Sequence, residues 1–354
     1  MKNEVKTCLL MMLFFVIMSV GFVNAQNETD FKAEITQDGT GVVILEYNGN
    51  ATNVVVPTTI QGIPVKEISR RAFPTWWPSI GGGLPITSIV IPEGVTKIQA
   101  RTFLGDRWFG YYNALKSITL PSKLTIIEDM AFWGCDVLES INLPEGLTSI
   151  GEGAFNGCSS LRSVTIPNSI VNIGGGAFAN SGLISIDWPA NITEIGYFRQ
   201  RTVGGLIYEG RGMFQGSKNL RTVIIPEGVI TITQSAFSGC TALNNITLPS
   251  TIRTIGSSAF NGCTSLVNIT IPSSIRSIED RVFSGCTSLA TVTLPSTIQS
   301  IGDRAFSGCT SLTTINIPET VTSIRFGSNT FSGCSSLSLA TQATLRRMGY
   351  TGSF

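Results

Sequence analysis

One repeat shows the pattern of hydrophobic and polar positions along this chain. Ile269 and Ile271 are separated by a polar residue, the period-two pattern of a short strand with one buried face. Pro272 ends that strand because proline has no N–H to donate. Ile275 and Ile278 then supply two more inward positions before a tight turn. The pattern predicts a coil made of a strand, a returning stretch and a turn.

The same coil returns every 23 residues, and a phenylalanine in its turn marks each copy. The spacing is regular for Phe132, Phe155 and Phe178, and again for Phe214, Phe237, Phe260, Phe283 and Phe306. Three more phenylalanines fit once insertions are allowed, which makes eleven units: Phe73, Phe103 and Phe331. One coil cannot enclose its own apolar side chains, so neighbouring coils must stack. At ~4.8 Å per strand, we expect a rod roughly 50 Å long.

The repeated run Ala-Phe-x-Gly-Cys-x-x-Leu-x-x-Ile-x-Leu-Pro-x-x-Ile-x-x-Ile-Gly resembles the BspA-like class of leucine-rich repeats. The resemblance covers residues 57 to about 337. It implies a right-handed repeat solenoid, built mainly from short β-strands and turns, on an exported and often surface-associated protein used for adhesion or protein recognition. It supplies no ligand, because a fold does not determine a function.

Residues 1–25 have the layout of a secretory signal peptide. Lys2 and Lys6 precede the apolar run Leu9–Val20, and cleavage is predicted after the small residue Ala25. A membrane anchor is the alternative, but the apolar run is shorter than the ~20 residues that a bilayer requires. We therefore expect an exported protein that is secreted, periplasmic or at the cell surface, with no transmembrane span after cleavage.

Residues 26–56 predict an N-terminal β cap on the solenoid of residues 57–337. Phe31–Thr36 and Val42–Tyr47 flank Asp38-Gly39, a hairpin turn signal, and Val54–Val56 could add another strand.

Residues 338–354 predict a C-terminal cap. The stretch from Leu339 to Met348 has the pattern of a short helix, and Gly349 is a typical stop. We expect Leu339, Ala343 and Met348 to cover the last coil.

Composition excludes several function classes. The formal net charge is +1 and only 13% of residues are charged, which argues against nucleic acid as a partner. The chain has no histidine, so the commonest general base and zinc ligand are missing. Asp129, Asp280 and Asp303 each precede a repeat phenylalanine by three residues, where we expect them to cap the turn rather than to catalyse. No catalytic residue or cofactor site is predicted.

Seven of the eight cysteines follow a repeat phenylalanine by three residues. Ser181 and Ser217 occupy the same position in other coils, so the position requires a small side chain. Stacked parallel cysteines have poor disulfide geometry, and no cysteine pair has the two-residue spacing of a zinc site. We expect mostly free thiols and no bound metal.

Three function classes compete. The leading one is a binding module for a protein or glycan, because outward hydroxyls and amides repeat along the strands, at Ser140, Asn142, Ser163, Thr165, Asn245, Thr247, Asn268, Thr270, Thr291 and Thr293. The second is a structural spacer of the cell envelope, favoured by the near-identical units from 237 to 309. The third is an enzyme, which the missing histidine opposes. The oligomeric state is not predicted.

Two insertions in consecutive coils carry the candidate ligand-binding residues. From Phe73 to Pro92 there are 19 positions and from Phe103 to Pro121 there are 18, against 12 in a regular unit. The aromatic residues in these insertions include Trp76, Trp77, Trp108, Tyr111 and Tyr112. Aromatic loops on a rigid scaffold anchor protein or sugar partners, although the same rings could instead fold back and shield the first coils. A third insertion, 196–212, is expected to leave from another side and carries three arginines.

Overall fold

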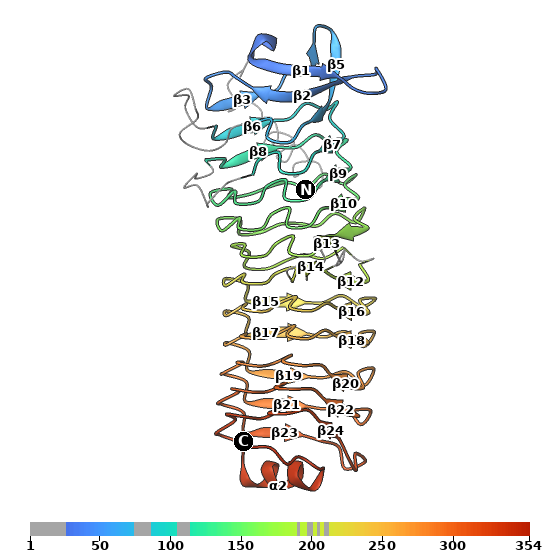
Figure 1. Cartoon of the computed structure of the whole chain (residues 1–354), viewed down its shortest axis with the longest axis vertical. Coiled ribbons are helices and arrows are strands. Elements are labelled where there is room, and N and C mark those ends of the chain that lie inside the picture. The colour runs from blue at the N-terminus through green and yellow to red at the C-terminus, as the bar shows by residue number, and fades with distance from the viewer. Residues whose placement is uncertain are drawn as a thin grey trace, which may run out of the picture.

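The computed structural model describes residues 26–73, 86–104, 114–189, 192–196, 201–203, 206–208 and 212–354. The chain forms a rod of stacked coils, with a group of strands at its N-terminal end and a single helix at the other (Figure 1). The solenoid predicted from the repeats is therefore confirmed. The predicted signal segment, 1–25, lies outside the described residues.

The N-terminal end is a hairpin that continues into the first coils. A short 3-10 helix, η1 (Glu28–Asp30), leads into β1 (Phe31–Ile35), which pairs antiparallel with β2 (Val42–Tyr47). β2 then pairs in parallel with β5 (Ile63–Ile68), and β4 (Thr59–Ile60) pairs antiparallel with β5. The predicted hairpin is confirmed, and Asp38 stabilises its turn by accepting a 3.0 Å hydrogen bond from the Thr40 N–H.

One set of strands covers one face of the rod, which we call the strand face. Its members are β3 (Asn53–Val55), β6 (Ser88–Val90), β8 (Ser117–Thr119), β15 (Thr222–Ile224), β17 (Asn245–Thr247), β19 (Asn268–Thr270), β21 (Thr291–Thr293) and β23 (Thr314–Asn316). Neighbours within each sheet are parallel and in register, so residues at equivalent repeat positions lie side by side. The central residue of each strand is buried and the two flanking residues face outward.

The returning stretches form a second set of strands, which we call the return face. Most contain two residues: β7 (Lys97–Ile98), β9 (Ile126–Ile127), β10 (Ser149–Ile150), β11 (Asn172–Ile173), β12 (Glu194–Ile195), β16 (Thr231–Ile232), β18 (Thr254–Ile255), β20 (Ser277–Ile278), β22 (Ser300–Ile301) and β24 (Arg325–Phe326). A separate hairpin pairs β13 (Arg201–Val203) with β14 (Leu206–Tyr208). In the described residues the return face changes sheet between β11 and β12 and the strand face between β8 and β15. Both faces change sheet again at the same coil, because β17 does not pair with β19 and β18 does not pair with β20.

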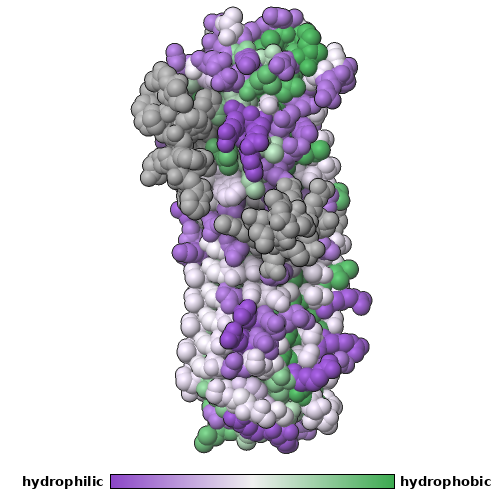
Figure 2. Space-filling view, viewed as in Figure 1, coloured by the Kyte–Doolittle hydropathy of each residue, from purple (hydrophilic) through white to green (hydrophobic). Residues whose placement is uncertain are grey.

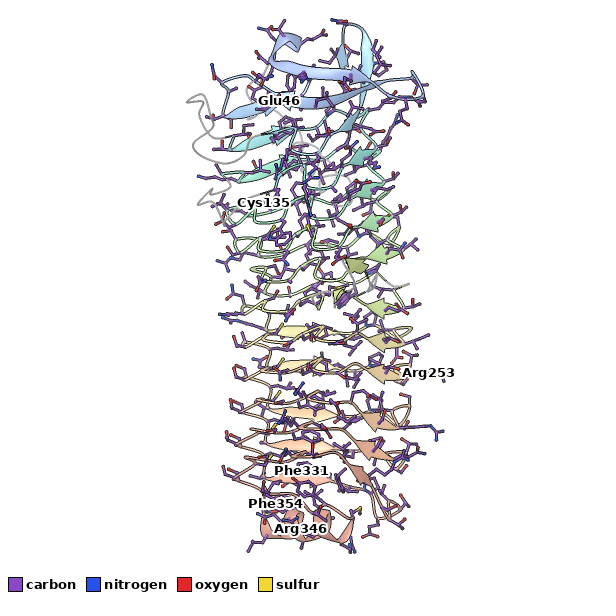
Figure 3. The ribbon with its side chains drawn as sticks, viewed as in Figure 1. Glu46, Cys135, Arg253, Phe331, Arg346 and Phe354 are labelled. Atoms are coloured by element: carbon purple, nitrogen blue, oxygen red, sulfur yellow. The ribbon has the colours of Figure 1, made fainter. Side chains whose placement is uncertain are left out.

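Eleven buried phenylalanines form a continuous stack along the rod, from Phe73 to Phe331. Successive rings are nearly parallel, with centroids 4.9–5.9 Å apart. The stack continues between Phe260 and Phe283, where the strands on both faces change sheet. Figure 3 shows Phe331 inside the last coils, with side chains of the neighbouring coils around it. The ring positions follow directly from the 23-residue spacing.

The aspartates at the turns cap a different partner from the one predicted. We expected each carboxylate to cap the N–H groups of its own turn. Instead Asp129, Asp280 and Asp303 accept hydrogen bonds of 2.7–2.8 Å from backbone N–H groups of the following coil. The reason is that N–H groups of the turn itself already donate to carbonyls of the next coil, as Phe283 does to Ala305 O at 2.8 Å.

The C-terminal helix, α2 (Leu339–Arg347), begins after the N-cap Ser338 and is followed by Gly349 with a φ of 102°. Its buried face differs from the prediction. Leu339 is 83% exposed and Ala343 is exposed, whereas Leu345 and Met348 are buried. The expected contact is therefore confirmed only for Met348. Leu345 and Met348 are three residues apart on one side of the helix, and Leu339 and Ala343 lie outside that side.

In the described part of the chain, no helix has the length and apolar character needed to span a bilayer. The single described α-helix, α2, contains nine residues.

Candidate binding surface

Two outward columns run along the strand face, one on each side of the buried central residues. The first column contains Asn53, Ser88, Ser117, Thr222, Asn245, Asn268, Thr291 and Thr314. The second contains Val55, Val90, Thr119, Ile224, Thr247, Thr270, Thr293 and Asn316. Much of the lower half of the rod is of intermediate hydropathy in Figure 2, as expected for serine, threonine and glycine. Most positions of the columns present short polar side chains at the spacing of the strands, and the second column also contains Val55, Val90 and Ile224.

The polar side chains of the columns are hydrogen-bonded only in places. Near the N-terminal end, the Ser88 hydroxyl donates to Asn53 Oδ1 at 2.7 Å. Near the C-terminal end, the Asn316 amide donates to Thr293 Oγ1 at 3.4 Å. Within the described residues, no intramolecular side-chain hydrogen bond involves Asn245, Thr247, Asn268, Thr270 or Thr291. These amides and hydroxyls are free to bond with a ligand.

The sequence located most of this surface correctly. All ten predicted residues face outward: eight are exposed, and Thr291 and Thr293 are partly exposed. The regular strands are interrupted in the middle of the rod, where residues 140–142 form no strand and Thr165 makes a single parallel bridge with Asp187. The polar columns are thus most regular in the C-terminal half.

Apolar residues on the same face were missed. Ile224 is 68% exposed and Ile184 is 43% exposed. The backbone N–H of Arg221 donates to Ile184 O at 3.0 Å, which joins the two coils at this point. Arg221 is itself exposed. We call Ile184, Arg221 and Ile224 the mid-rod patch. The available signal was an isoleucine at an outward repeat position, where the preceding coil carries Asp187 and the following coil carries Thr247.

The mid-rod patch continues into polar neighbours. Ile224 is in register with Thr247 on the adjacent strand, and the Asn244 N–H donates to Arg221 O at 3.0 Å. Exposed isoleucine and arginine beside amide and hydroxyl groups combine apolar contact area with hydrogen-bonding capacity. Protein interfaces commonly have this composition, with arginine enriched.

The aromatic residues predicted to bind a ligand lie outside the described residues: Trp76, Trp77, Trp108, Tyr111 and Tyr112. Described residues at the bases of the two insertions are close together. The rings of Phe73 and Phe103, just before each insertion, are 5.5 Å apart, and the Lys116 N–H donates to Thr87 O at 2.8 Å just after them. The two insertions therefore begin and end in adjacent coils.

A shallow hollow of about 590 Å³ lies on the return face. Its lining includes Ser149, Asn172, Glu152 and the glycines Gly151 and Gly174. The hollow exists because these coils carry glycine where the preceding coil carries Glu128. A Cβ at Gly151 would meet the backbone of Asp129, so glycine also permits the close approach of the coils.

The cysteines are buried and chemically protected. All seven described cysteines are free thiols, as predicted, and each donates to the carbonyl of the phenylalanine one coil earlier at 3.1–3.3 Å. Burial raises the pKa of the Cys240 and Cys286 thiols to about 12. These thiols are therefore unsuited to act as nucleophiles at neutral pH. Among the described residues, no group of three or more cysteine, aspartate or glutamate side chains has the arrangement of a metal site.

Comparison with known proteins identifies the repeat. The family model for the BspA type leucine rich repeat region matches residues 82–199 and 210–338, with six copies. No curated protein shows significant similarity to the chain.

Several solved structures of bacterial proteins are similar to this chain. A leucine-rich repeat protein from Bacteroides ovatus is 23% identical with a TM-score of 0.55, and the match covers 94% of this chain and 99% of that one. A leucine rich cell surface protein from Faecalibacterium prausnitzii is 25% identical with a TM-score of 0.44, covering 94% and 100%. The pneumococcal vaccine antigen PcpA is 20% identical with a TM-score of 0.41, covering 93% and 96%. With the family model matching more than half of the chain and the stacked coils that its repeat predicts, this protein belongs to the BspA-type leucine-rich repeat family.

Proposed function

We propose that this chain is an exported, non-enzymatic binding protein that recognises a protein ligand through its strand face and acts in adhesion or another interaction at a surface. The observation that carries the proposal is the mid-rod patch, where Ile224 is 68% exposed on a rigid stack of coils. A large apolar side chain held outward near the middle of the rod, on the first regular strand of its C-terminal half, is suited to insert into a partner. Export is supported by the signal-like segment at residues 1–25.

The columns around the patch add specificity. Asn245 and Thr247 flank the buried centre of β17, beside the strand that carries Ile224. Both side chains are exposed, so each can donate and accept hydrogen bonds at the border of an apolar contact. The hydroxyls and amides alone would suit a glycan equally well. The exposed isoleucines favour a protein.

The aromatic insertions extend the proposal to the N-terminal half of the rod. Trp76, Trp77, Trp108 and Tyr111 belong to insertions whose ends lie in adjacent coils. We propose that they form a second contact for the same ligand. This assignment rests on their residue types and on the adjacency of the bases of the two insertions.

The test is a binding array of extracellular-matrix proteins, envelope proteins and glycans, followed by affinity measurement with two variants. The triple variant Ile184→Ser, Arg221→Ala, Ile224→Ser should weaken binding of the captured protein at least ~10-fold, with little change in melting temperature. The matched control, Val171→Ser with Ile230→Ser, removes exposed apolar residues from the return face and should leave affinity unchanged.

Several outcomes would contradict the proposal. Capture of no ligand would favour the alternative function, a structural spacer of the cell envelope. Equal losses of affinity in the triple variant and its control would exclude the strand face as the site.

Serine substitution of Trp76, Trp77, Trp108 and Tyr111 together tests the second contact. A large fall in melting temperature would show that these rings pack on the coils instead.

A further inference from the structure

Arginine residues gather on the return face of the C-terminal coils. Arg253 and Arg276 occupy the same repeat position, immediately before β18 and β20, and Arg325 begins β24. All three side chains are exposed. Figure 3 shows Arg253 projecting from the edge of the rod, and Figure 2 shows hydrophilic residues gathered along the same edge. We call Arg253, Arg276, Gln299 and Arg325 the arginine edge.

Backbone hydrogen bonds join the members of the arginine edge. The Gln299 N–H donates to Arg276 O at 2.8 Å, and the Arg325 N–H donates to Gln299 O at 3.0 Å. At a strand spacing of ~4.8 Å, Arg276 and Arg325 are therefore about 10 Å apart along the rod. The coil that carries Arg253 precedes them, with the rings of Phe260 and Phe283 5.5 Å apart. The edge is a short row of cations on a rigid support, in which Arg325 is in register with Ser300, one residue beyond the position of Arg276 and Gln299.

Within the described part of the chain, these arginines have no carboxylate partners. Among the described residues, no ion pair involves Arg253, Arg276 or Arg325. Glu279 directly follows β20, and it accepts a 2.8 Å hydrogen bond from the Ser277 hydroxyl. The neighbouring coils carry Gly256, Gly302 and Gly327 at the position of Glu279. The row therefore keeps an excess of positive charge.

A second pair of arginines lies at the turn that follows. Arg281 and Arg304 are exposed, each immediately after an aspartate. The carboxylates of those aspartates, Asp280 and Asp303, accept backbone N–H groups of the next coil at 2.7–2.8 Å. These hydrogen bonds hold the acids against the backbone, while the guanidinium groups remain free to extend toward a ligand.

The charge on the return face reverses along the rod. Toward the N-terminus, the coils that line the hollow carry Glu128, Asp129 and Glu152. Glu128 there pairs with Lys97, with the Lys97 Nζ 2.7 Å from Glu128 Oε1. The three arginines of the edge thus lie in the C-terminal coils, whereas the hollow is lined by acidic side chains.

We infer that the arginine edge binds a linear acidic polysaccharide. Arginine recognises carboxylate and sulfate through a planar fork of donors, and every cation on the edge is arginine rather than lysine. The row also includes the Gln299 amide, and hydroxyl groups from Thr254, Ser277 and Ser300 lie on the same strands. Amides and hydroxyls are suited to the hydroxyl groups of a sugar.

A polysaccharide fits this edge better than other polyanions. Single-stranded nucleic acids require aromatic side chains on which bases stack. The described residues of the edge include no exposed aromatic side chain. A folded acidic protein would require more apolar contact area than this edge offers: among the described residues, Ile230, one coil before Arg253, is the one exposed large apolar side chain beside it. A flexible linear polymer with regularly repeated charges needs neither.

The test uses the intact chain and immobilised polymers. Heparin presents sulfates, polygalacturonate presents carboxylates, and neutral dextran and a single-stranded DNA oligonucleotide serve as comparison polymers. Binding to at least one acidic polysaccharide is expected at about 50 mM salt and should weaken strongly near 0.5 M, because surface charges are screened. The polysaccharide that binds more tightly shows whether the edge prefers sulfate or carboxylate groups.

Charge-reversal variants locate the site. R253E/R276E/R325E should weaken polysaccharide binding at least ~10-fold, and the neutral variant R253Q/R276Q/R325Q should show an intermediate loss. The control K32E/K123E/R347E makes the same change in net charge at exposed positions outside the edge and should change affinity less than ~2-fold. Melting temperatures of all variants establish that they fold.

Three results would overturn the inference. They are an absence of binding to either acidic polysaccharide at low salt, equal losses in the edge variant and the control, and tighter binding to DNA than to both polysaccharides. None of these results bears on the mid-rod patch, which lies on the other face and is tested with a protein ligand.

Discussion

The cysteine position shows how a single residue is selected by the stack. Each thiol donates to the carbonyl of the phenylalanine in the preceding coil, at 3.1–3.3 Å. Ser217 makes the same bond to Phe178 O at 2.8 Å. The requirement is a small side chain that donates one hydrogen bond inside the rod. This requirement does not involve redox chemistry, and serine can therefore replace cysteine in some coils.

The buried thiols predict a specific pH dependence. The folded pKa of Cys240 and Cys286 is about 12, above the ordinary value of 9.0, because burial disfavours the thiolate. Between those values the folded state binds more protons than the unfolded state, so these groups stabilise the fold fully below pH 9 and progressively less toward pH 12. Melting temperature should therefore fall as pH rises above 9.

A double variant, Cys240→Ser with Cys286→Ser, should fold, and its melting temperature should fall less above pH 9 than that of the parent chain.

Thiol titration provides an independent measurement. The folded protein should react slowly at pH 8, and the unfolded, unreduced protein should expose most of its seven described cysteines. Finding one or no reactive thiol after unfolding would mean that disulfides form.

At the scale of elements, the two ends close the stack in different ways. The N-terminal hairpin adds Tyr47 and Phe31 to the ring stack, with Tyr47 6.3 Å from Phe73. At the C-terminal end, Tyr350 lies edge-on to Phe331 at 5.1 Å, and Arg346 covers the ring of Phe354 at 4.6 Å. Figure 3 shows Phe331, Arg346 and Phe354 grouped at this end. Aromatic side chains thus shield the first and last rings from water.

The two leucines of α2 offer a matched test of the C-terminal cap. Leu345→Ala removes a fully buried side chain and should destabilise the protein by ~2–5 kcal/mol. Leu339→Ala changes a residue that is 83% exposed and should stay within ~0.5 kcal/mol of the parent. Urea unfolding measures both. Similar losses for the two leucines would show that the helix packs in another orientation.

For the molecule as a whole, the repeat predicted most of the architecture. The 23-residue spacing gave the positions of the stacked phenylalanines, and the outward polar columns followed from alternation around each buried central residue. The hydrogen-bond partners of Asp280 and Asp303 could not be predicted from the repeat, because those hydrogen bonds join different coils and depend on how the coils align. The mid-rod patch was missed because Ile224 takes a position that carries threonine in the next three coils.

Stacking also predicts how stability is distributed along the rod. Phe260→Ala removes a ring that packs between Phe237 and Phe283, each 5.5 Å away, and should cost ~3–5 kcal/mol. Phe73→Ala should cost less, because the terminal coils can unfold while the remaining column stays intact. Thermal unfolding of both variants is the measurement, and equal losses would count against a nearest-neighbour description.

The uniform junction between coils also bears on how the length of such a protein can change. From Phe237 to Phe306 every coil meets the next at a ring separation of 5.4–5.5 Å, through the same hydrogen bond from each phenylalanine N–H to the following coil. Deleting or duplicating one 23-residue unit in this region recreates the turn junction that was there before. Recombination within the gene can therefore lengthen or shorten the rod in whole coils. Because Arg253, Arg276 and Gln299 lie 23 residues apart in these coils, each such exchange also adds or removes one position of the arginine edge, while the mid-rod patch stays unchanged.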